Sequence, residues 1–254
     1  MEFTEFHNWV YKEFKINLNS YKPEQLNRRI LSLMSRSGIG SLDEYKKILM
    51  VDKEQRERFL DFVTINVTEF FRNPELFFEL QDVIRDYSKD KNKLKIWSAA
   101  CSMGCEPYSV AMLINEISEN LKADILATDI DTNILKKAQA GKYISAEMKN
   151  VSDTFKSKYF NKLNDNYIIN NKIKSMVTFK KHDLILDNYD KDFDLIICRN
   201  VIIYFKSDVK KEIFKKFSNS LKKGGILFVG ATESIYNYKE FNLEKMSTFI
   251  YKKV

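Results

Sequence analysis

The fold is decided by one stretch near residue 100, which reads Leu94-Lys95-Ile96-Trp97-Ser98-Ala99-Ala100-Cys101-Ser102-Met103-Gly104-Cys105-Glu106-Pro107. Its first seven residues predict a strand, and the apolar pattern from Pro107 predicts a helix as far as Asn120. Between them lies a loop of small and polar residues, in which Gly104 permits a tight turn and the close approach of a ligand. This order is typical of the ligand-binding end of a parallel α/β sheet.

The alternation of strands and helices continues along the chain. Further strands are predicted at 124–128, 193–198 and 225–230, and further helices at 132–140 and 206–221. Such alternation predicts a mostly parallel sheet covered by helices on both faces. Residues 151–178 interrupt it, because 153–160 resemble a short helix, while 167–169 and 176–179 resemble a small hairpin. We interpret 151–178 as a small inserted subdomain.

The first part of the chain follows a different pattern. Residues 1–88 show helical periodicity throughout, with Leu26, Ile30 and Leu33 recurring at spacings of three and four. A short lysine-rich linker follows. We therefore expect an N-terminal all-helical domain at 1–88 and an α/β domain at 89–254.

Composition limits the class of protein. The chain has 254 residues, 44% of them hydrophobic, which excludes wholesale disorder. The net charge is +7, but the surplus lysines are scattered, which favours a solvated surface over a nucleic-acid site. Three cysteines do not make a disulfide framework, and their spacing does not fit zinc, so we expect no metal. Without a signal peptide or membrane span, the sequence predicts a cytoplasmic protein, and we expect a monomer.

Polar residues follow three of the predicted strands. They lie in the loop around Gly104 and Glu106, in Thr128-Asp129-Ile130-Asp131, and in Cys198-Arg199-Asn200. The carboxyl ends of parallel strands meet at one edge of a sheet, where ligands bind. A loop with one glycine and an acidic residue is a poor phosphate cradle, but it suits a cationic nucleoside such as S-adenosylmethionine. An ordinary strand–loop–helix turn is the alternative, and Asp131 either joins the site or caps the next helix.

Four blocks of the sequence resemble motifs of one family, the chemotaxis receptor methyltransferases (CheR). They are Asn66-Val67-Thr68-Glu69-Phe70-Phe71-Arg72, Trp97–Ser109, Ala127–Asp131 and Cys198–Phe205. The resemblance covers nearly the whole chain, in order. It implies an α/β fold, that of a class I S-adenosylmethionine-dependent methyltransferase, which is Rossmann-like with a mostly parallel sheet. An N-terminal all-helical domain and a small inserted β-subdomain would complete it.

The resemblance also implies an activity. It is the transfer of a methyl group from S-adenosylmethionine to glutamate side chains on the cytoplasmic helical domain of chemoreceptors. The products would be glutamate methyl esters, used in sensory adaptation, and S-adenosyl-L-homocysteine. The insertion looks shorter than in relatives that dock on a receptor's C-terminal pentapeptide, so we expect pentapeptide-independent action. A methyltransferase for another substrate such as RNA, and a non-catalytic cofactor-binding module, are the alternatives.

The family's cofactor-binding residues carry over to matching positions of this chain. They are Asn66, Thr68, Arg72, Gly104, Glu106, Asp129, Asp183, Leu184, Asn200 and Val201. On that pattern Glu106 would hold the methionine amino group, and Asp129 would hold the ribose hydroxyls. The chain departs from the family at Met103 and Cys105, which replace Thr and Glu, and at Asp183, where the family usually has Asn.

The catalytic and substrate-contacting residues are also implied by the resemblance. Arg72 and Tyr204 would be catalytic, and Arg28, Arg29 and Arg36 would contact the substrate. A glutamate carboxylate has a pKa of about 4.3, so it is ionised at neutral pH and needs no general base. The guanidinium fork of Arg72 could pair with that carboxylate and orient it.

Overall fold

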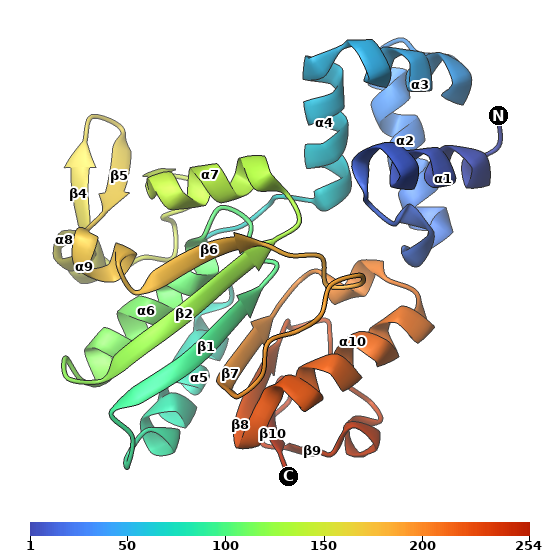
Figure 1. Ribbon diagram of the computed structural model, residues 1–254. Helices are drawn as coiled ribbons and strands as arrows, with labels where there is room; N and C mark the ends of the chain where they lie inside the picture. The colour runs from blue at the N-terminus through green and yellow to red at the C-terminus, as the bar shows by residue number, and fades with distance from the viewer. The chain divides into compact units, whose positions relative to one another are not determined.

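The computed structural model describes all residues 1–254, which form two compact units (Figure 1). The helical unit comprises Met1–Asn66 and Ile202–Ile213, and the sheet unit comprises Val67–Val201 and Phe214–Val254. No helix in either unit is both long and apolar enough to cross a membrane.

The helical unit is built around an aromatic cluster. Its elements are α1 (Phe3–Phe14), η1 (Leu18–Ser20), α2 (Pro23–Arg36), α3 (Leu42–Val51) and α4 (Lys53–Thr64). The ring of Phe6 lies 5.5 Å from that of Trp9, 6.1 Å from that of Tyr45 and 6.0 Å from that of Phe59, between centroids. Three helices therefore contribute aromatic side chains to one core, which agrees with the helical periodicity of the sequence.

The segment that carries Tyr204 belongs to the helical unit. It contains the short turn η2 (Ile202–Tyr204). The N–H of Lys22 donates to the carbonyl of Tyr204 at 2.9 Å, and the N–H of Lys206 donates to the carbonyl of Ser20 at 3.0 Å. These two bonds flank a short antiparallel bridge, so the backbone at Tyr204 is fixed to the segment before α2.

Seven strands form the sheet of the second unit, in the order β6-β2-β1-β7-β8-β10-β9. The strands are β1 (Lys93–Ala99), β2 (Lys122–Asp129), β6 (Val177–Lys181), β7 (Phe193–Cys198), β8 (Leu221–Val229), β9 (Leu243–Lys245) and β10 (Ile250–Lys253). The first five in spatial order are parallel, and β10 and β9 run antiparallel at one edge. The strand order reverses between β1 and β7, which is where such sheets bind ligands.

Helices cover both faces of this sheet (Figure 1). The helices α5 (Pro74–Tyr87), α6 (Cys105–Ile117) and α7 (Thr132–Ala140) lie on one face. The other face is covered by the part of α10 (Ser207–Ser220) that belongs to the sheet unit, from Phe214 onward. On the α10 face, Trp97 of β1 packs edge-on against Phe217, with 5.4 Å between ring centroids. On the opposite face, Phe77 of α5 meets Phe228 of β8 at 6.0 Å. The predicted class I methyltransferase architecture is confirmed.

The helix α5 packs with the sheet. Its Leu80 lies in the same hydrophobic core as Ile96 of β1. The sequence groups 74–87 with the N-terminal helices, because an amphipathic helix looks the same whichever partner covers its apolar stripe. The compact units divide after Asn66. The domain boundary at residue 88 stays a prediction.

The inserted β-subdomain differs from the predicted pairing. It contains β3 (Lys142–Ile144), β4 (Phe160–Leu163) and β5 (Asn166–Ile169) in a three-stranded antiparallel sheet, with α8 (Asp153–Tyr159) and α9 (Asn171–Lys174). The predicted hairpin between 167–169 and 176–179 is wrong. The side chain of Asn170 caps α9 by accepting the N–H of Ile173 at 3.0 Å, so the polar residues form a helix start and not a turn. The next strand, β6, pairs with β2 in the main sheet.

Candidate functional site

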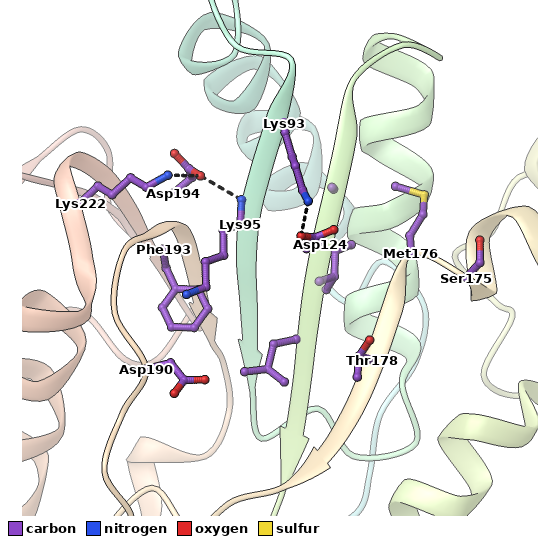
Figure 2. A pocket seen from close by; sticks show the side chains of 13 residues that line it. Lys93, Lys95, Asp124, Ser175, Met176, Thr178, Asp190, Phe193, Asp194 and Lys222 are labelled. Atoms are coloured by element: carbon purple, nitrogen blue, oxygen red, sulfur yellow. Dashed lines mark hydrogen bonds and ion pairs between the residues drawn. The ribbon is translucent and has the colours of Figure 1, made fainter.

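A hollow of about 700 Å³ opens where the strands begin, at what we call the amino edge of the sheet (Figure 2). It is lined by the first residues of β1, β2, β6 and β7. Four of its six charged side chains form ion pairs with one another. Lys93 Nζ lies 2.6 Å from Asp124 Oδ2, and Lys222 Nζ lies 2.9 Å from Asp194 Oδ2. Apart from the exposed Asp190, the acidic side chains of the hollow are therefore already matched.

Asp194 shows how this edge satisfies a buried carboxylate. Only 1% of Asp194 is exposed. It accepts the Tyr87 hydroxyl, the Lys95 N–H and the Lys222 ammonium, each at 2.9 Å, and the Lys91 ammonium at 3.5 Å. Burial alone would raise the pKa of Asp194, but these donors outweigh it and the pKa is lowered. Four donors fill the roughly four acceptor positions of a carboxylate, so no capacity is left for a ligand.

The opposite, carboxyl edge begins with a strained loop after β1. Ala100, Ser102 and Gly104 all have positive φ, of 66°, 49° and 87°. A Cβ on Gly104 would lie 3.1 Å from Ala138 Cβ, and this tight contact together with the φ of 87° favours glycine there. Such strain in the two other residues costs about 1–3 kcal/mol each and clusters at ligand sites. Ser102 Oγ is buried without a hydrogen-bond partner.

Glu106 is the second residue of α6, which begins directly after this loop. Its Oε1 accepts the Ser98 hydroxyl at 2.7 Å, and its Oε2 lies 4.0 Å from Arg199 Nη1. Burial raises the pKa of Glu106 to about 7, because the Arg199 charge and the Ser98 hydroxyl offset only part of the desolvation. A buried acid with a raised pKa at a loop edge is a candidate ligand-binding group.

Asp129 ends β2 beside the same loop. Its carboxylate accepts the N–H of Ser102 at 2.8 Å and that of Asp131 at 3.1 Å, and burial raises its pKa to about 6. Acceptor positions remain for further donors. Asp131 caps α7, since its Oδ1 accepts the N–H groups of Asn133 at 2.8 Å and Ile134 at 3.2 Å. The capping alternative for Asp131 is confirmed.

Asp183 and Leu184 follow β6 at the same edge. Asp183 Oδ1 accepts the N–H groups of Ile185 at 2.7 Å and Leu186 at 3.2 Å. Its other oxygen is buried without a partner, and Leu184 is buried. The unfilled Asp183 oxygen is an acceptor available to a bound amine.

Glu233 holds the turn after β7, and it is a site residue that the sequence motifs do not predict. Its carboxylate accepts the N–H of Asn200 at 2.6 Å and those of Val201 and Gly230 at 2.9 Å. A Cβ on Gly230 would collide with the Glu233 carboxylate. The available signal was a glycine at a strand end with an acid three positions later. Glu233 thus fixes the backbone of the predicted cofactor residues Asn200 and Val201.

Thr68 and Arg72 lie in the turn 67–73, which precedes α5. Phe71 and Asn73 on either side of Arg72 have positive φ, of 49° and 62°. The Arg72 guanidinium donates to the first carbonyl of the turn at 3.2 Å. The backbone of the turn is therefore strained, and the Arg72 side chain folds back onto it.

The sheet unit brings nine predicted residues to its carboxyl edge and the adjoining turn. They are Thr68, Arg72, Gly104, Glu106, Asp129, Asp183, Leu184, Asn200 and Val201. Asn66, Tyr204 and the three arginines of α2 belong to the helical unit. Arg28 and Arg36 are exposed. Arg29 instead donates to the carbonyl of Phe62 and lies over its ring, 4.6 Å from the centroid.

Comparison with known proteins points to one family. The family model described as "CheR methyltransferase, SAM binding domain" matches residues 66–250, and "CheR methyltransferase, all-alpha domain" matches residues 1–64. Over 96% of its length the chain is 39% identical to a chemotaxis protein methyltransferase of Listeria monocytogenes, covering 94% of that protein. It is 36% identical to one of Borreliella burgdorferi, covering 96% of this chain and 91% of the relative. It is also 36% identical to chemotaxis protein methyltransferase 1 of Pseudomonas aeruginosa, covering 93% and 91%.

Proposed function

The chain belongs to the CheR methyltransferase family, and we propose that it methylates glutamate side chains on the cytoplasmic helical domain of chemoreceptors. The methyl donor is S-adenosylmethionine. The observation that carries the proposal is the match to both CheR domains in order, over residues 1–64 and 66–250. Relatives 36% to 39% identical are named chemotaxis protein methyltransferases and support the same substrate class. The product would be a glutamate methyl ester, so the enzyme would be a protein-glutamate O-methyltransferase.

The carboxyl edge of the sheet fits this cofactor. Ser102 Oγ and one oxygen of Asp183 are buried without partners, and burial raises the pKa values of Glu106 and Asp129 to about 7 and about 6. A ligand that brings an ammonium group, two hydroxyls and an aromatic amine would satisfy such groups. We propose that Glu106 accepts from the methionine amino group, Asp129 from the ribose hydroxyls and Asp183 from the adenine amine. When bound, S-adenosylmethionine supplies an electrophilic methyl group on a sulfonium.

The chain contributes to the chemistry by positioning the reacting groups. The substrate carboxylate is ionised at neutral pH, so the site needs no general base. Arg72 would pair with this carboxylate through its planar fork and orient it for in-line attack. Orientation of this kind contributes about 7–11 kcal/mol in favourable cases. The catalytic role of Tyr204 in the helical unit stays a prediction.

The substrate would be recognised by the basic face of α2. Arg28 and Arg36 are exposed there and suit the acidic side chains of receptor helices. Arg29 would reach a substrate only by giving up its bond to the Phe62 carbonyl. We therefore propose Arg28 and Arg36 as the primary substrate contacts of the three.

We also propose that the enzyme acts as a cytoplasmic monomer, independently of a receptor C-terminal pentapeptide. The support is the short inserted sheet, in which β3 and β4 span only Lys142–Ile144 and Phe160–Leu163. Such short edges offer few backbone groups for pairing with a peptide strand. Receptor fragments with and without a C-terminal extension should be methylated at equal initial rates, and light scattering should give a mass near 30.0 kDa.

The proposed function is tested by label transfer. Methyl-labelled S-adenosylmethionine is incubated with the protein and a purified chemoreceptor cytoplasmic fragment, and the product is treated with mild alkali. Release of labelled methanol would establish a carboxyl methyl ester. Base-stable label would indicate another acceptor atom. Binding of S-adenosylhomocysteine without any receptor labelling would favour a different substrate or a non-catalytic module.

A further inference from the structure

Arg199 places a buried charge among three segments of the carboxyl edge. It directly follows β7 and is 6% exposed. Its guanidinium lies between the rings of Phe77 and Phe228, 5.1 and 5.0 Å from their centroids. Burial lowers the pKa of Arg199, while the charge of Glu106 opposes that shift. Burying a cation destabilises the fold unless hydrogen bonds and opposite charges compensate, so the partners of Arg199 indicate its role.

One side of the Arg199 fork holds the turn that presents Arg72. Nη2 donates to the carbonyl of Arg72 at 2.8 Å and to Asn73 Oδ1 at 3.0 Å. On the other flank of the turn, the N–H of Phe71 donates to Ser109 Oγ at 3.0 Å. Both Phe71 and Asn73 have positive φ, so these bonds help to hold the turn in a strained shape.

The other side of the fork faces Glu106. Nη1 lies 4.0 Å from Glu106 Oε2, and among the groups that counteract the burial of Glu106 the Arg199 charge ranks first. The Ser98 hydroxyl and the more distant charge of Arg72 act in the same direction, and Glu233 acts against them. Arg199 is thus the principal charge that opposes protonation of this carboxylate.

We propose that Arg199 is a positioning residue that couples the two halves of the site, fixing the backbone of the Arg72 turn and balancing the charge of Glu106. The proposal rests on the proposed function, because it assigns Arg72 to the substrate carboxylate and Glu106 to the cofactor amino group. Arg199 acts through these two residues. One side chain would then set the geometry of both reactants.

Two substitutions separate the fork from the charge. Arg199→Lys keeps a positive charge but replaces a rigid planar fork with a single ammonium on a flexible stem. Arg199→Met removes both. Arg85→Lys is the matched control, because Arg85 is an exposed residue of α5 whose side chain pairs with Asp82.

The first measurement needs no receptor. Hydrogen exchange of the turn 67–73 and binding of S-adenosylhomocysteine across pH are compared among these variants. We expect Arg199→Lys to exchange about tenfold faster in 67–73, with a much smaller change in the other segments of the sheet unit and an unchanged pH profile of binding. As pH falls, Arg199→Met should begin to lose affinity for S-adenosylhomocysteine at a higher pH than the unmodified protein does, because its Glu106 protonates more readily. Unchanged hydrogen exchange of residues 67–73 in Arg199→Lys overturns the proposal. If Arg199→Met does not fold, the result for Arg199→Lys alone decides.

The second measurement is a double-mutant cycle with the receptor fragment. Arg199→Lys should lower kcat by about tenfold, with the KM for S-adenosylmethionine nearly constant. In an Arg72→Ala background it should cause little further loss, since it acts through Arg72. A full tenfold loss in that background would refute the coupling. If the unmodified protein labels no receptor, the proposed function fails, while exchange and binding still test Arg199.

Discussion

The two edges of the seven-stranded sheet bury carboxylates in opposite ways. At the amino edge, Asp194 is surrounded by donors that lower its pKa despite its burial. At the carboxyl edge, burial raises the pKa values of Glu106 and Asp129 to about 7 and about 6. A hollow of about 700 Å³ lies at the amino edge, beside the matched Asp194.

With the cofactor at the carboxyl edge, as proposed, incompletely matched carboxylates locate the ligand site better than the hollow at the amino edge does. A buried carboxylate with too few donors destabilises the fold unless a ligand supplies the missing partners. A buried carboxylate with four donors instead ties strands and helices together. The amino edge should therefore govern stability, and the carboxyl edge should govern binding and turnover.

The largest effect is expected at the amino edge. Asp194→Ala leaves the Tyr87 hydroxyl and the Lys95 N–H without their acceptor, which should lower the free energy of unfolding by about 3–4 kcal/mol. Urea unfolding at neutral pH measures this. Asp190→Asn is the control, an exposed carboxylate of the same hollow, with an expected change within about 0.5 kcal/mol. The contrast between the two edges fails if the free energy of unfolding of Asp194→Ala equals that of the control. It also fails if the folded Asp194→Ala variant binds S-adenosylhomocysteine more weakly than the unmodified protein does.

Arg72→Ala tests the division of labour at the carboxyl edge. Removing the fork that orients the substrate should lower the rate of methyl transfer at least about a hundredfold, equivalent to about 3 kcal/mol. Affinity for S-adenosylhomocysteine should change by less than about threefold, because Glu106 and Asp129 remain. Label transfer and calorimetry measure the two quantities, with Arg85→Ala as an exposed control. A folded Arg72→Ala that has lost cofactor affinity would show that Arg72 serves the cofactor instead.

Glu106→Gln tests the pKa shift that marks this edge. Because the pKa of Glu106 is raised from 4.5 to about 7, the folded state holds this proton more tightly than the unfolded state. Its contribution to stability is present below about pH 4.5 and is lost as pH rises through about 7. Relative to Glu106→Gln, the unmodified protein should lose on the order of 2 kcal/mol between about pH 5 and pH 8.

Urea unfolding of both cofactor-free proteins at the two pH values tests this sign. A stability difference that is constant with pH would mean that Glu106 is ionised at both values, and it would remove one contrast with Asp194. The same variant should bind S-adenosylhomocysteine more weakly at about pH 8, since a neutral amide replaces a carboxylate opposite an ammonium group.

Local patterns predicted much of the sheet unit. The strand predicted at 193–198 and the helix predicted at 132–140 have the same bounds in the structure. Both predictions rest on periodicity and capping, which are encoded within a few residues. Glu106 and Asp129 were found because strand ends and loops have local signatures, and the parallel topology then places them at one edge.

The rest depends on contacts between distant residues. Arg199 lies in the Cys198–Phe205 motif, but its bond to Asn73 joins residues that are 126 positions apart in the chain. Glu233 likewise accepts the N–H of Asn200 across 33 positions. The sequence wrongly predicts β6 as part of a hairpin, because a short apolar run does not reveal which sheet it joins. Burial and pairing of charges follow from tertiary structure, so the contrast between the two edges was not visible in the sequence.

The smallest effect is expected at Asp131, two residues from Asp129. Asp131 caps α7 through the N–H groups of Asn133 and Ile134, so Asp131→Ala should lower stability by about 1 kcal/mol and leave cofactor affinity within about twofold. Asp129→Asn should do the reverse, with weaker binding of S-adenosylhomocysteine and little loss of stability. Urea unfolding and calorimetry on the pair separate a capping carboxylate from a binding one. If Asp131→Ala weakens binding as much as Asp129→Asn does, the carboxyl edge uses both acids, and an acceptor already occupied by helix N–H groups can still belong to the ligand site.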